Sequence, residues 1–296
     1  MGFTLSPLRY PGGKSRLSGF VRAVLESNRL LGGSYIEPFA GGAGIAWALL
    51  FDGSVSTVHL NDYDPAIYAF WRSVRDHAEQ FCKLIVDTPV RMTTWSRQRA
   101  VILNPSDYSL LQLGFATFFL NRTNRSGVIR GGVIGGKHQA GGWKLGCRYN
   151  KADLVKRVEK IALFRDRIYL YHTEARRFIR DVLPEVELRS LVFLDPPYYS
   201  RGQDLYMDIY SKADHRELAG HIREGITQPW IVSYDDAPAI RRYYSGLARE
   251  KYRLSYSVAD RYVGSELLFF SSRLEIPVEA IPEYPVKRHL KGMSDG

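Results

Sequence analysis

Leu191-Val192-Phe193-Leu194-Asp195-Pro196-Pro197-Tyr198-Tyr199 is the stretch from which the architecture is most directly inferred. Four consecutive apolar residues are typical of a strand buried on both faces, as in the middle of a parallel sheet. Proline lacks the N–H of a sheet ladder and disfavours helix in the residue before it, so the chain leaves the sheet at Asp195 in an extended turn. An isolated Asp-Pro pair would indicate only a turn. The full motif instead favours a site at the carboxyl end of a central strand, where open α/β sheets bind ligands.

A strand, a glycine loop and a helix near the N-terminus predict a second part of this site. Residues 34–37 form the expected strand, which ends at Glu37, and residues 45–50 form an apolar helix after the loop Pro38-Phe39-Ala40-Gly41-Gly42-Ala43-Gly44. The glycines allow the backbone to pass close to a ligand at the helix N-terminus. A second strand over 55–60 precedes Asp62, whose carboxylate can accept hydrogen bonds from ribose hydroxyls. These elements predict a nucleoside-binding βαβ unit, although the glycine spacing departs from that of dinucleotide enzymes.

The N-terminal stretch Arg9-Tyr10-Pro11-Gly12-Gly13-Lys14-Ser15 has two glycines before a lysine. Its glycines permit close approach to a ligand, and the lysine can meet a carboxylate or a phosphate. The spacing is not that of a Walker A loop. Taken alone, the stretch is most simply a turn into a helix over 17–26.

Residues 65–120 predict a helical insertion after the second strand. Apolar residues recur at helical spacing over 66–81 and 110–120, and loops are expected around Pro89 and Pro105. The following forty residues, 121–160, hold ten lysines and arginines against two acids, a net +8 of the protein's +10. A charge run is usually a solvated loop. Here the mixture of arginine, glycine and aromatic residues such as Trp143 favours nucleic acid, because arginine reads guanine edges and lysine meets phosphates.

The rest of the sheet is predicted from residue 168 onward. We expect strands over 168–172 and 230–234, helices over 175–183, 214–224 and 238–244, and two antiparallel strands within 252–270 that turn around 260–265 and close the sheet edge. Glu174 follows the first of these strands, where an adenine amino group could be met. The predicted domains are a catalytic domain over 1–64 and 153–276, an inserted target-recognition domain over 65–152 and a poorly ordered tail over 277–296.

Composition limits the classes of function. The chain has 296 residues, 45% of them hydrophobic, a net charge of +10 and a pI near 9.5, which suggests a polyanionic partner. Two cysteines far apart argue against disulfides or a zinc site, and the histidines show no metal-binding pattern; His215 and His221 are expected on a helix surface. Neither a signal peptide nor an apolar run of membrane-spanning length is evident, so we expect a cytoplasmic protein without a membrane or a metal.

In this order the pieces resemble the Dam-type adenine-N6 DNA methyltransferases, from Arg9 to about Ser271. The matching pieces are Tyr10-x-Gly-Gly-Lys14, Glu37-Pro-Phe-x-Gly-Gly, Asn61-Asp62, Asn121-Arg122 with Ser126-Gly127, Arg148-Tyr149 and Asp195-Pro-Pro-Tyr198. The resemblance implies S-adenosylmethionine as methyl donor, double-stranded DNA as substrate and a monomer in solution. It also implies an α/β fold, a mostly parallel Rossmann-like methyltransferase sheet with an antiparallel edge strand and an inserted, mainly helical DNA-recognition domain.

The resemblance also implies roles for single residues. The expected cofactor-binding residues are Tyr10, Gly13 and Lys14 at the methionine end, Glu37, Pro38, Phe39 and Gly41 along the cofactor, Asp62 at the ribose, and Glu174 and Asp195. The expected DNA-binding residues are Arg122, Asn124, Arg125, Ser126, the guanine-contacting Arg130, Lys137, Lys144, Arg148 and Tyr149. Two features depart from the family: the glycine-rich stretch 131–146 is longer and looser than its usual hairpin, and Thr173-Glu174 stands where an aspartate is frequent. A GATC-like site is therefore only the family's suggestion.

The chemistry of amine methylation explains the motif. The amine of adenine is a weak nucleophile because its lone pair is delocalised into the ring, and acceptors for both N–H bonds make the nitrogen more electron-rich. The Asp195 carboxylate and the Pro196 carbonyl fit those acceptors, Pro197 stiffens the turn, and Tyr198 offers a ring for a flipped base. Neither Cys82 nor Cys147 follows a proline, so cytosine-C5 chemistry is disfavoured. Methylation of cytosine N4 or of RNA remains an alternative, as does a non-catalytic DNA-binding regulator.

Overall fold

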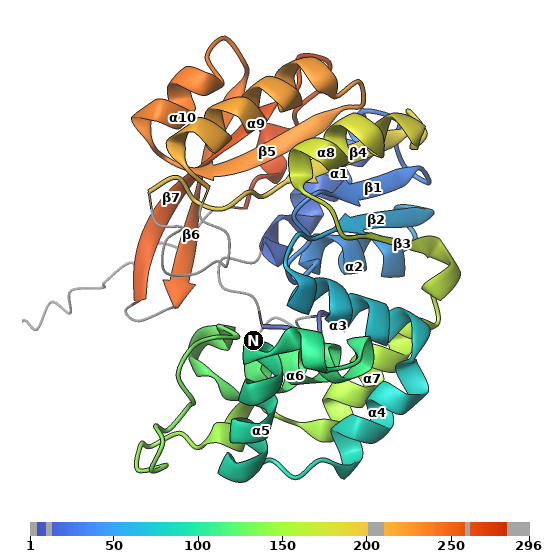
Figure 1. Ribbon diagram of the computed structural model, residues 1–296. Helices are drawn as coiled ribbons and strands as arrows, with labels where there is room; N and C mark the ends of the chain where they lie inside the picture. The colour runs from blue at the N-terminus through green and yellow to red at the C-terminus, as the bar shows by residue number, and fades with distance from the viewer. Residues whose placement is uncertain (1–4, 10–13, 201–209, 258–260, 283–296) are drawn as a thin grey trace, which may run out of the picture.

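A seven-stranded sheet of order β3-β2-β1-β4-β5-β7-β6 forms the centre of the computed structural model, which describes residues 5–9, 14–200, 210–257 and 261–282 (Figure 1). The strands are β1 (Ser34–Glu37), β2 (Thr57–Asn61), β3 (Ile168–Tyr171), β4 (Ser190–Leu194), β5 (Trp230–Asp235), β6 (Arg249–Ser257) and β7 (Arg261–Phe270). Strands β1 to β5 are parallel, and β7 runs antiparallel to both β5 and β6. The predicted α/β fold is confirmed, with the antiparallel strand one place in from the edge. The predicted turn at 260–265 is wrong in part, because β7 already begins at Arg261; residues 258–260 lie outside the described residues.

Strand β4 lies in the middle of the sheet, as its apolar run predicts. All five of its residues are buried, and their side chains alternate between the two faces. Leu191 and Phe193 belong to one hydrophobic cluster, and Val192 and Leu194 belong to another on the opposite face. Helices α1 (Ser18–Ser27) and α2 (Gly44–Phe51) cover the first face, and α8 (Ala175–Asp181), α9 (Lys212–Gly225) and α10 (Pro238–Tyr243) cover the second.

The predicted helical insertion is present after β2. It contains α3 (Pro65–Asp76), α4 (Ala78–Asp87), α5 (Met92–Leu103) and α6 (Leu110–Thr123). The predicted helix over 66–81 is two helices, because the backbone at His77 is non-helical, with φ −134° and ψ 37°. Helix α5 lies between the two predicted loops and was not expected from the sequence.

Helix α7 (Lys151–Ala162) lies with the inserted helices rather than with the sheet (Figure 1). It packs chiefly against α4 and also against α3. The predicted domain boundary at residue 153 therefore falls inside a helix, and the helical unit extends to the end of α7. One continuous hydrophobic cluster runs from the sheet through α3 into α4, α5, α6 and α7, so the insertion shares the core of the sheet domain.

Two expectations about single residues have a structural outcome. His215 is buried, not exposed as predicted, and its Nδ1 lies 3.0 Å from the hydroxyl of Tyr234, because α9 packs this side of its helix onto β5. Both cysteines are free thiols. Within the described residues there is no cluster of three or more potential metal ligands, and no helix there combines the length and hydropathy needed to span a bilayer.

Gly114 permits the close packing of α6 on α3. A Cβ at this position would lie 2.5 Å from both the Ala69 carbonyl oxygen and the Ser73 hydroxyl. We expect Gly114→Ala to lower the free energy of unfolding by about 1–3 kcal/mol, since two helices must move apart. Gly220→Ala in α9, where a Cβ would meet nothing within 4 Å, is the control and should raise stability by about 0.5–1 kcal/mol. Urea unfolding curves measure both, and equal effects would contradict the packing role of Gly114.

Candidate active site

Strands β1 and β4 lie side by side at the centre of the sheet, where the strand order reverses direction. In open α/β sheets the crevice outside the carboxyl ends of such a strand pair is the usual ligand site. Glu37 is the last residue of β1, and Asp195 directly follows β4. The two predicted carboxylates therefore meet at this crevice.

Lys14 joins the N-terminal segment to this crevice. Its ammonium nitrogen Nζ lies 2.8 Å from Oδ1 and 3.0 Å from Oδ2 of Asp195. It also lies 3.2 Å from Oε2 of Glu266 in β7 and 3.3 Å from the hydroxyl of Tyr198. The lysine side chain is 4% exposed and the Asp195 side chain 26%, so this ion pair is shielded on the lysine side and open on the aspartate side.

Burial dominates the electrostatics of Asp195. It raises the pKa of the Asp195 carboxyl to about 6; the Lys14 ammonium opposes the shift, and the Glu266 carboxylate adds to it. For Lys14, burial alone would lower the pKa, but the carboxylates of Asp195 and Glu266 together raise it well above its usual value. Lys14 is therefore a permanent cation at neutral pH, and Asp195 is mostly a carboxylate.

Glu266 is the residue of the site that sequence reasoning missed. It is fully buried, and its carboxylate accepts hydrogen bonds from Tyr198 at 2.7 Å, from Ser233 at 2.9 Å and from the hydroxyl of Tyr252. A lone acid inside Ser265-Glu266-Leu267-Leu268-Phe269-Phe270 was the available signal. An acid in an otherwise apolar buried strand must have partners, because an unpaired buried charge is very costly.

Glu37 is 5% exposed. Burial raises the pKa of its carboxyl to about 8; the nearby Asp195 carboxylate contributes to the shift. At neutral pH the side chain is therefore mainly a neutral acid that can donate as well as accept a hydrogen bond. This suits a ligand that itself carries both acceptors and donors.

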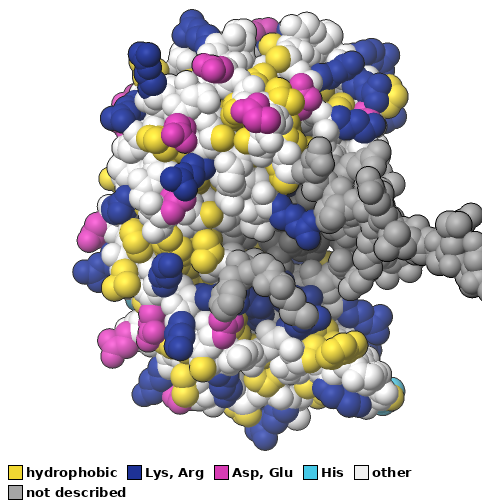
Figure 2. Space-filling model, turned by 180° about the vertical axis from the view of Figure 1, so that it is seen from behind, with side chains coloured by type: hydrophobic (Ala, Val, Ile, Leu, Met, Phe, Trp, Pro, Cys, Tyr) yellow, Lys and Arg dark blue, Asp and Glu magenta, His cyan; other side chains and the backbone are white. Residues whose placement is uncertain are grey.

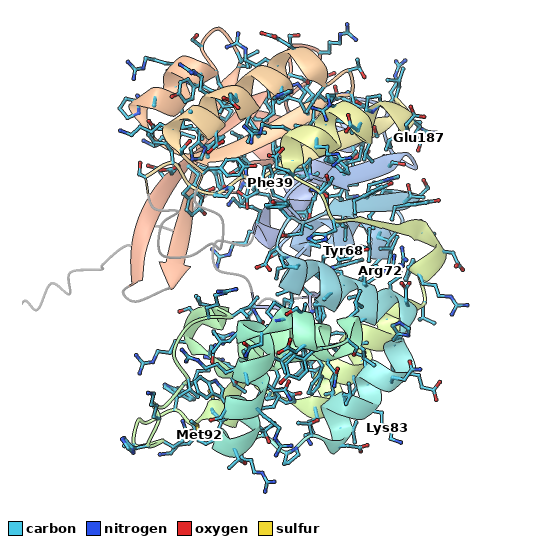
Figure 3. All side chains as sticks on the ribbon, viewed as in Figure 1. Phe39, Tyr68, Arg72, Lys83, Met92 and Glu187 are labelled. Atoms are coloured by element: carbon cyan, nitrogen blue, oxygen red, sulfur yellow. The ribbon has the colours of Figure 1, made fainter. Side chains whose placement is uncertain are left out.

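Asp62 lies at the carboxyl end of the neighbouring strand β2. Its Oδ2 accepts a hydrogen bond from the Gly41 amide at 2.8 Å, which fixes the glycine loop, and its Oδ1 accepts one from the Asp64 amide at 3.0 Å. The side chain is half-buried, and its expected contact with ribose hydroxyls stays a prediction. The loop residue Phe39 is also half-buried and packs edge-on against Tyr210 at 6.2 Å between ring centres. Figure 3 labels Phe39 at the end of the sheet that carries the site and Glu187 at the opposite end.

Other predicted site residues have mainly structural partners. The Glu174 carboxylate caps α8 by accepting from the amides of Arg176 and Arg177, and it also accepts from the hydroxyl of Tyr210. These contacts fix the Glu174 side chain, and its expected contact with an adenine amino group stays a prediction. Pro38 and Pro196 are buried, Pro197 is half-buried, and the Pro38 carbonyl accepts from Asn61 at 2.9 Å. Tyr10 and Gly13 lie outside the described residues.

Tyr198 is only 6% exposed. Lys14 lies 5.3 Å from the centre of its ring, and Glu266 holds its hydroxyl. The ring is therefore covered rather than presented for stacking.

Asp235, at the end of β5, fixes the two residues that follow Tyr198. Its carboxylate accepts hydrogen bonds from the amides of Tyr199 at 2.8 Å and Ser200 at 3.0 Å. Sequence reasoning did not identify Asp235 either.

The predicted DNA-binding residues divide into an exposed set and a buried set. The exposed set comprises Arg125, Arg130, Lys137, Lys144 and Arg148, and Ser126 is half-buried.

The buried set comprises Asn124, Arg122 and Tyr149. Asn124 is fully buried: its side-chain amide donates to the carbonyls of Val128 and Ile129, and its Oδ1 accepts from Trp95. Arg122 donates to the Pro7 carbonyl at 2.7 Å, and burial lowers its pKa to about 9. The Tyr149 ring packs against Phe118 and Phe119, so all three buried residues have partners inside the protein.

The glycine-rich stretch 131–146 is more ordered than the sequence suggests. Gln139 organises it: its side-chain amide donates to the carbonyls of Ile134 and Gly136, and its Oε1 accepts from the Leu145 amide. Trp143 is 70% exposed, and the Arg148 guanidinium lies 5.8 Å from its ring centre.

We name the stretch 125–148 the basic loop. Its cations have no acidic neighbours within the sequence of the loop, and Figure 2 shows lysine and arginine side chains on both parts of the molecule and at the waist between them.

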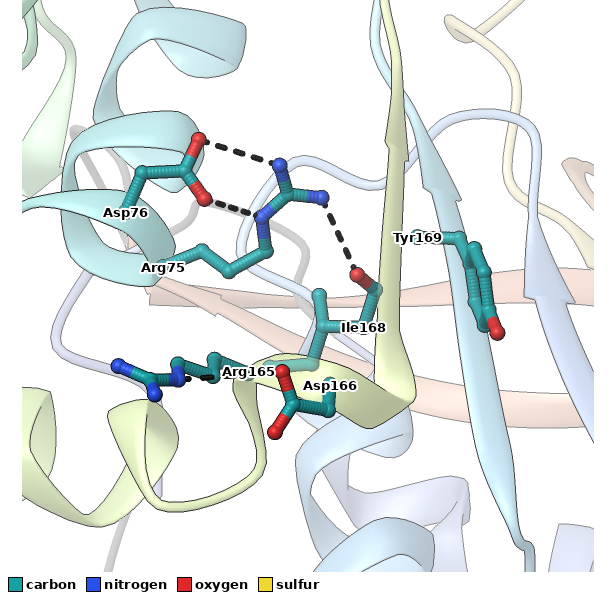
Figure 4. A pocket seen from close by; sticks show the side chains of 6 residues that line it. All are labelled: Arg75, Asp76, Arg165, Asp166, Ile168 and Tyr169. Carbon is teal, nitrogen blue, oxygen red and sulfur yellow. Dashed lines mark hydrogen bonds and ion pairs between the residues drawn. The ribbon is translucent and has the colours of Figure 1, made fainter.

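Two surface hollows lie elsewhere, at the edge strand β3. One, of about 440 Å³, is lined by Arg75, Asp76, Arg165, Asp166, Ile168 and Tyr169 (Figure 4). Its arginines have acidic neighbours: Arg75 Nε lies 2.5 Å from Asp76, and Arg165 lies 3.8 Å from Asp166. The second, of about 580 Å³, lies on the open face of β2 and β3 and has three acidic residues on its rim: Asp181, Glu185 and Glu187. Neither hollow offers the unbalanced positive charge of the basic loop.

Comparison with known proteins gives one family. A family model described as D12 class N6 adenine-specific DNA methyltransferase matches residues 10–258. A search of curated proteins finds no match. Among solved structures, a Pyrococcus horikoshii protein assigned as an RNA methyltransferase is 10% identical, with a TM-score of 0.42, and the match covers 89% of this chain and 84% of that one. The rRNA methyltransferase AviRa from Streptomyces viridochromogenes is 14% identical, with a TM-score of 0.38 and coverage of 88% and 86%.

The raised pKa of Glu37 predicts a pH dependence of stability. Between pH 4.5 and about 8 the folded state keeps the Glu37 proton while the unfolded state has lost it, so the wild type loses stability as pH rises. Relative to Glu37→Gln, which has no proton to lose, we expect the wild-type free energy of unfolding to fall by about 1.4 kcal/mol per pH unit in this window. Urea unfolding at pH 5, 6, 7 and 8 measures the difference. Parallel curves for the two proteins would contradict a protonated Glu37.

Proposed function

The chain belongs to the D12 class N6 adenine-specific DNA methyltransferase family, and on this premise we propose that it methylates the N6 amine of adenine in double-stranded DNA at a short site. Membership makes it a methyltransferase that uses S-adenosylmethionine. The observation that carries the proposal is the Asp195 carboxylate at the carboxyl end of β4, held by Lys14 and open on the side of the crevice.

The residues of the crevice fit the methyl donor. S-adenosylmethionine, when bound, supplies a methyl group on a positively charged sulfur, and it carries a ribose diol. The crevice offers carboxyl groups at the ends of three adjacent parallel strands, Asp62 after β2, Glu37 on β1 and Asp195 after β4. Asp62 is placed for the ribose hydroxyls, and Phe39 offers an apolar surface beside it. A ligand that is cationic and rich in hydroxyls matches this set better than an anionic one.

Asp195 and the Pro196 carbonyl would act on the amine of the base. Accepting both N–H bonds makes the nitrogen more electron-rich and orients its lone pair, so positioning and electrostatics supply most of the effect. Lys14 contacts both oxygens of Asp195; Oδ1 is buried, and Oδ2 has a second lone pair for the substrate. With a pKa of about 6, Asp195 can also take up the proton that the methylated amine releases. No strong base is needed.

The basic loop would hold the DNA. Its exposed lysines and arginines suit phosphates, an arginine such as Arg130 suits the O6 and N7 atoms of guanine, and the exposed Trp143 ring suits stacking. The amine of a paired adenine cannot reach Asp195, so the base must leave the duplex. Tyr198 is covered in this structure, and we expect the incoming base to displace part of that cover. A GATC-like site and a monomeric enzyme remain the family's suggestion for this chain.

Asp195→Ala should abolish detectable methyl transfer, because the amine loses its carboxylate acceptor. The expected loss in the rate is at least about a hundredfold. Binding of S-adenosylmethionine, measured by calorimetry, should weaken but persist, because Asp62 and Glu37 remain. Mass spectrometry of nucleosides from treated DNA and RNA measures the product. Asp166→Ala is the control and should be fully active. The Asp166 side chain is 92% exposed and lies just before β3, at the end of the sheet opposite the crevice. N4-methylcytosine, methylated RNA or an active Asp195→Ala protein would each contradict the proposal.

Arg130→Ala should relax or weaken recognition at one guanine by about 1–3 kcal/mol, since a bidentate contact to one base edge is lost. Methylation rates on duplexes substituted at each position of the mapped site measure this. Arg165→Ala removes another exposed arginine, outside the basic loop, and should leave the site preference unchanged. An unchanged preference in Arg130→Ala would exclude this role for the residue.

A further inference from the structure

Trp143 differs from every other tryptophan of the chain. It is 70% exposed, whereas the remaining four of the five tryptophans are between 0 and 5% exposed: Trp47, Trp71, Trp95 and Trp230. Burial of an aromatic ring is a large part of the energy of many interfaces, so an indole left in water on a binding loop is available for a ligand. Exposure alone marks no site, but the surroundings of this ring narrow what it can bind.

Contacts along the basic loop hold the backbone that carries Trp143. Its carbonyl lies against Gly135, where φ is 83° and an added Cβ would come within 2.6 Å of the carbonyl oxygen. Two residues further on, the Leu145 amide donates to Oε1 of Gln139 at 2.8 Å, and the Lys144 ammonium donates to the Gln139 carbonyl. The ring therefore projects from an ordered turn, and less conformational entropy is lost when it takes up a ligand.

Arg148 covers one face of the Trp143 ring. Its guanidinium carbon lies 5.8 Å from the ring centre, which is the arrangement of a cation–π pair. No other described residue makes a ring or cation contact with this indole. A side chain that wedges between two stacked base pairs needs both faces of its ring. An indole with a guanidinium on one face suits a single aromatic ring stacked on the other.

The charge around the ring favours an anionic ligand. The basic loop contains no acid and five cationic side chains: Arg125, Arg130, Lys137, Lys144 and Arg148. A ligand that joins an aromatic face to nearby negative charge is a nucleotide whose base is not enclosed in a duplex. A paired base offers only its edges, because the neighbouring pairs cover its faces.

We propose that Trp143, backed by Arg148, stacks on an unpaired base of the bound DNA. Under the proposed function such a base arises in each turnover, because an adenine that leaves the duplex leaves its partner base unpaired. The inference rests on the proposed function for DNA as the polyanion. It adds that the basic loop binds the face of a base as well as phosphates and base edges.

Tryptophan fluorescence tests the stack directly, because Trp143 is the one tryptophan of the five that is exposed. A single-stranded oligothymidylate should quench the emission of the wild-type protein, and a duplex of guanine and cytosine alone should quench it far less. Trp143→Phe keeps an aromatic ring and removes this fluorophore. It should bind the oligothymidylate within about threefold of wild type and show no quenching. Wild-type emission that stays unchanged at saturating oligothymidylate would overturn the proposal.

The affinities of Trp143→Ala separate stacking from attraction to phosphates. This variant should bind the oligothymidylate about tenfold more weakly and the guanine–cytosine duplex less than about twofold more weakly, with the salt dependence of binding unaltered. Lys137→Ala is the matched control, since it removes an exposed cation of the same loop and keeps the ring. It should reduce the slope of log affinity against log salt for the oligothymidylate by about 0.7. Equal losses of Trp143→Ala on the two DNAs, or a changed slope, would refute the stack.

The proposed function is measured separately on the same wild-type protein. Mass spectrometry of nucleosides from treated duplex DNA reports adenine methylation without reference to Trp143. N6-methyladenine together with unquenched tryptophan emission would overturn the stack and leave the proposed function standing. Quenching by the oligothymidylate without N6-methyladenine would overturn the proposed function and leave the stack standing.

Discussion

The ammonium of Lys14, enclosed between the carboxylates of Asp195 and Glu266, is the interaction on which the site depends. It connects three segments that are far apart in sequence: the N-terminal turn, the end of β4 and the buried strand β7. None of the three charges could be buried alone, because an unpaired ion in a protein interior costs several kcal/mol. The three therefore specify one arrangement of the chain at the carboxyl end of the sheet. Removing Lys14 takes the ammonium from both carboxylates, whereas removing either carboxylate leaves Lys14 beside the other.

Much of this arrangement was predictable from the sequence. The apolar run of β4 and the two prolines after it placed Asp195 at a sheet crevice, and the glycine loop placed Glu37 and Asp62 beside it. These predictions depend on local patterns, which neighbouring residues determine. Glu266 and Asp235 were not predicted from the sequence, because their roles depend on which strands become neighbours. Only the insertion of β7 between β5 and β6 brings Glu266 level with Asp235 and Tyr252.

The helical unit illustrates a second limit. Charge and glycine content correctly suggested a basic loop, but they could not separate arginines on the surface from those in the core. Arg122 and Tyr149 belong to the packed interior, whereas Arg130 and Arg148 are exposed, and the difference is set by how α6 ends and the chain turns back. Composition also did not show what holds the glycine-rich stretch 131–146 in its conformation. One side chain, Gln139, supplies three hydrogen bonds that the composition does not reveal.

The N-terminal segment connects the two parts of the molecule. Asn121 at the end of α6 accepts from the Arg9 amide and donates to the Arg9 carbonyl, and a Cβ at Gly127 would lie 2.2 Å from that carbonyl. Arg9 is therefore clamped to the base of the basic loop, and Lys14 enters the crevice only five residues later. The segment is therefore fixed at two points by described contacts: Arg9 by the helical unit and Lys14 by the carboxylates of Asp195 and Glu266.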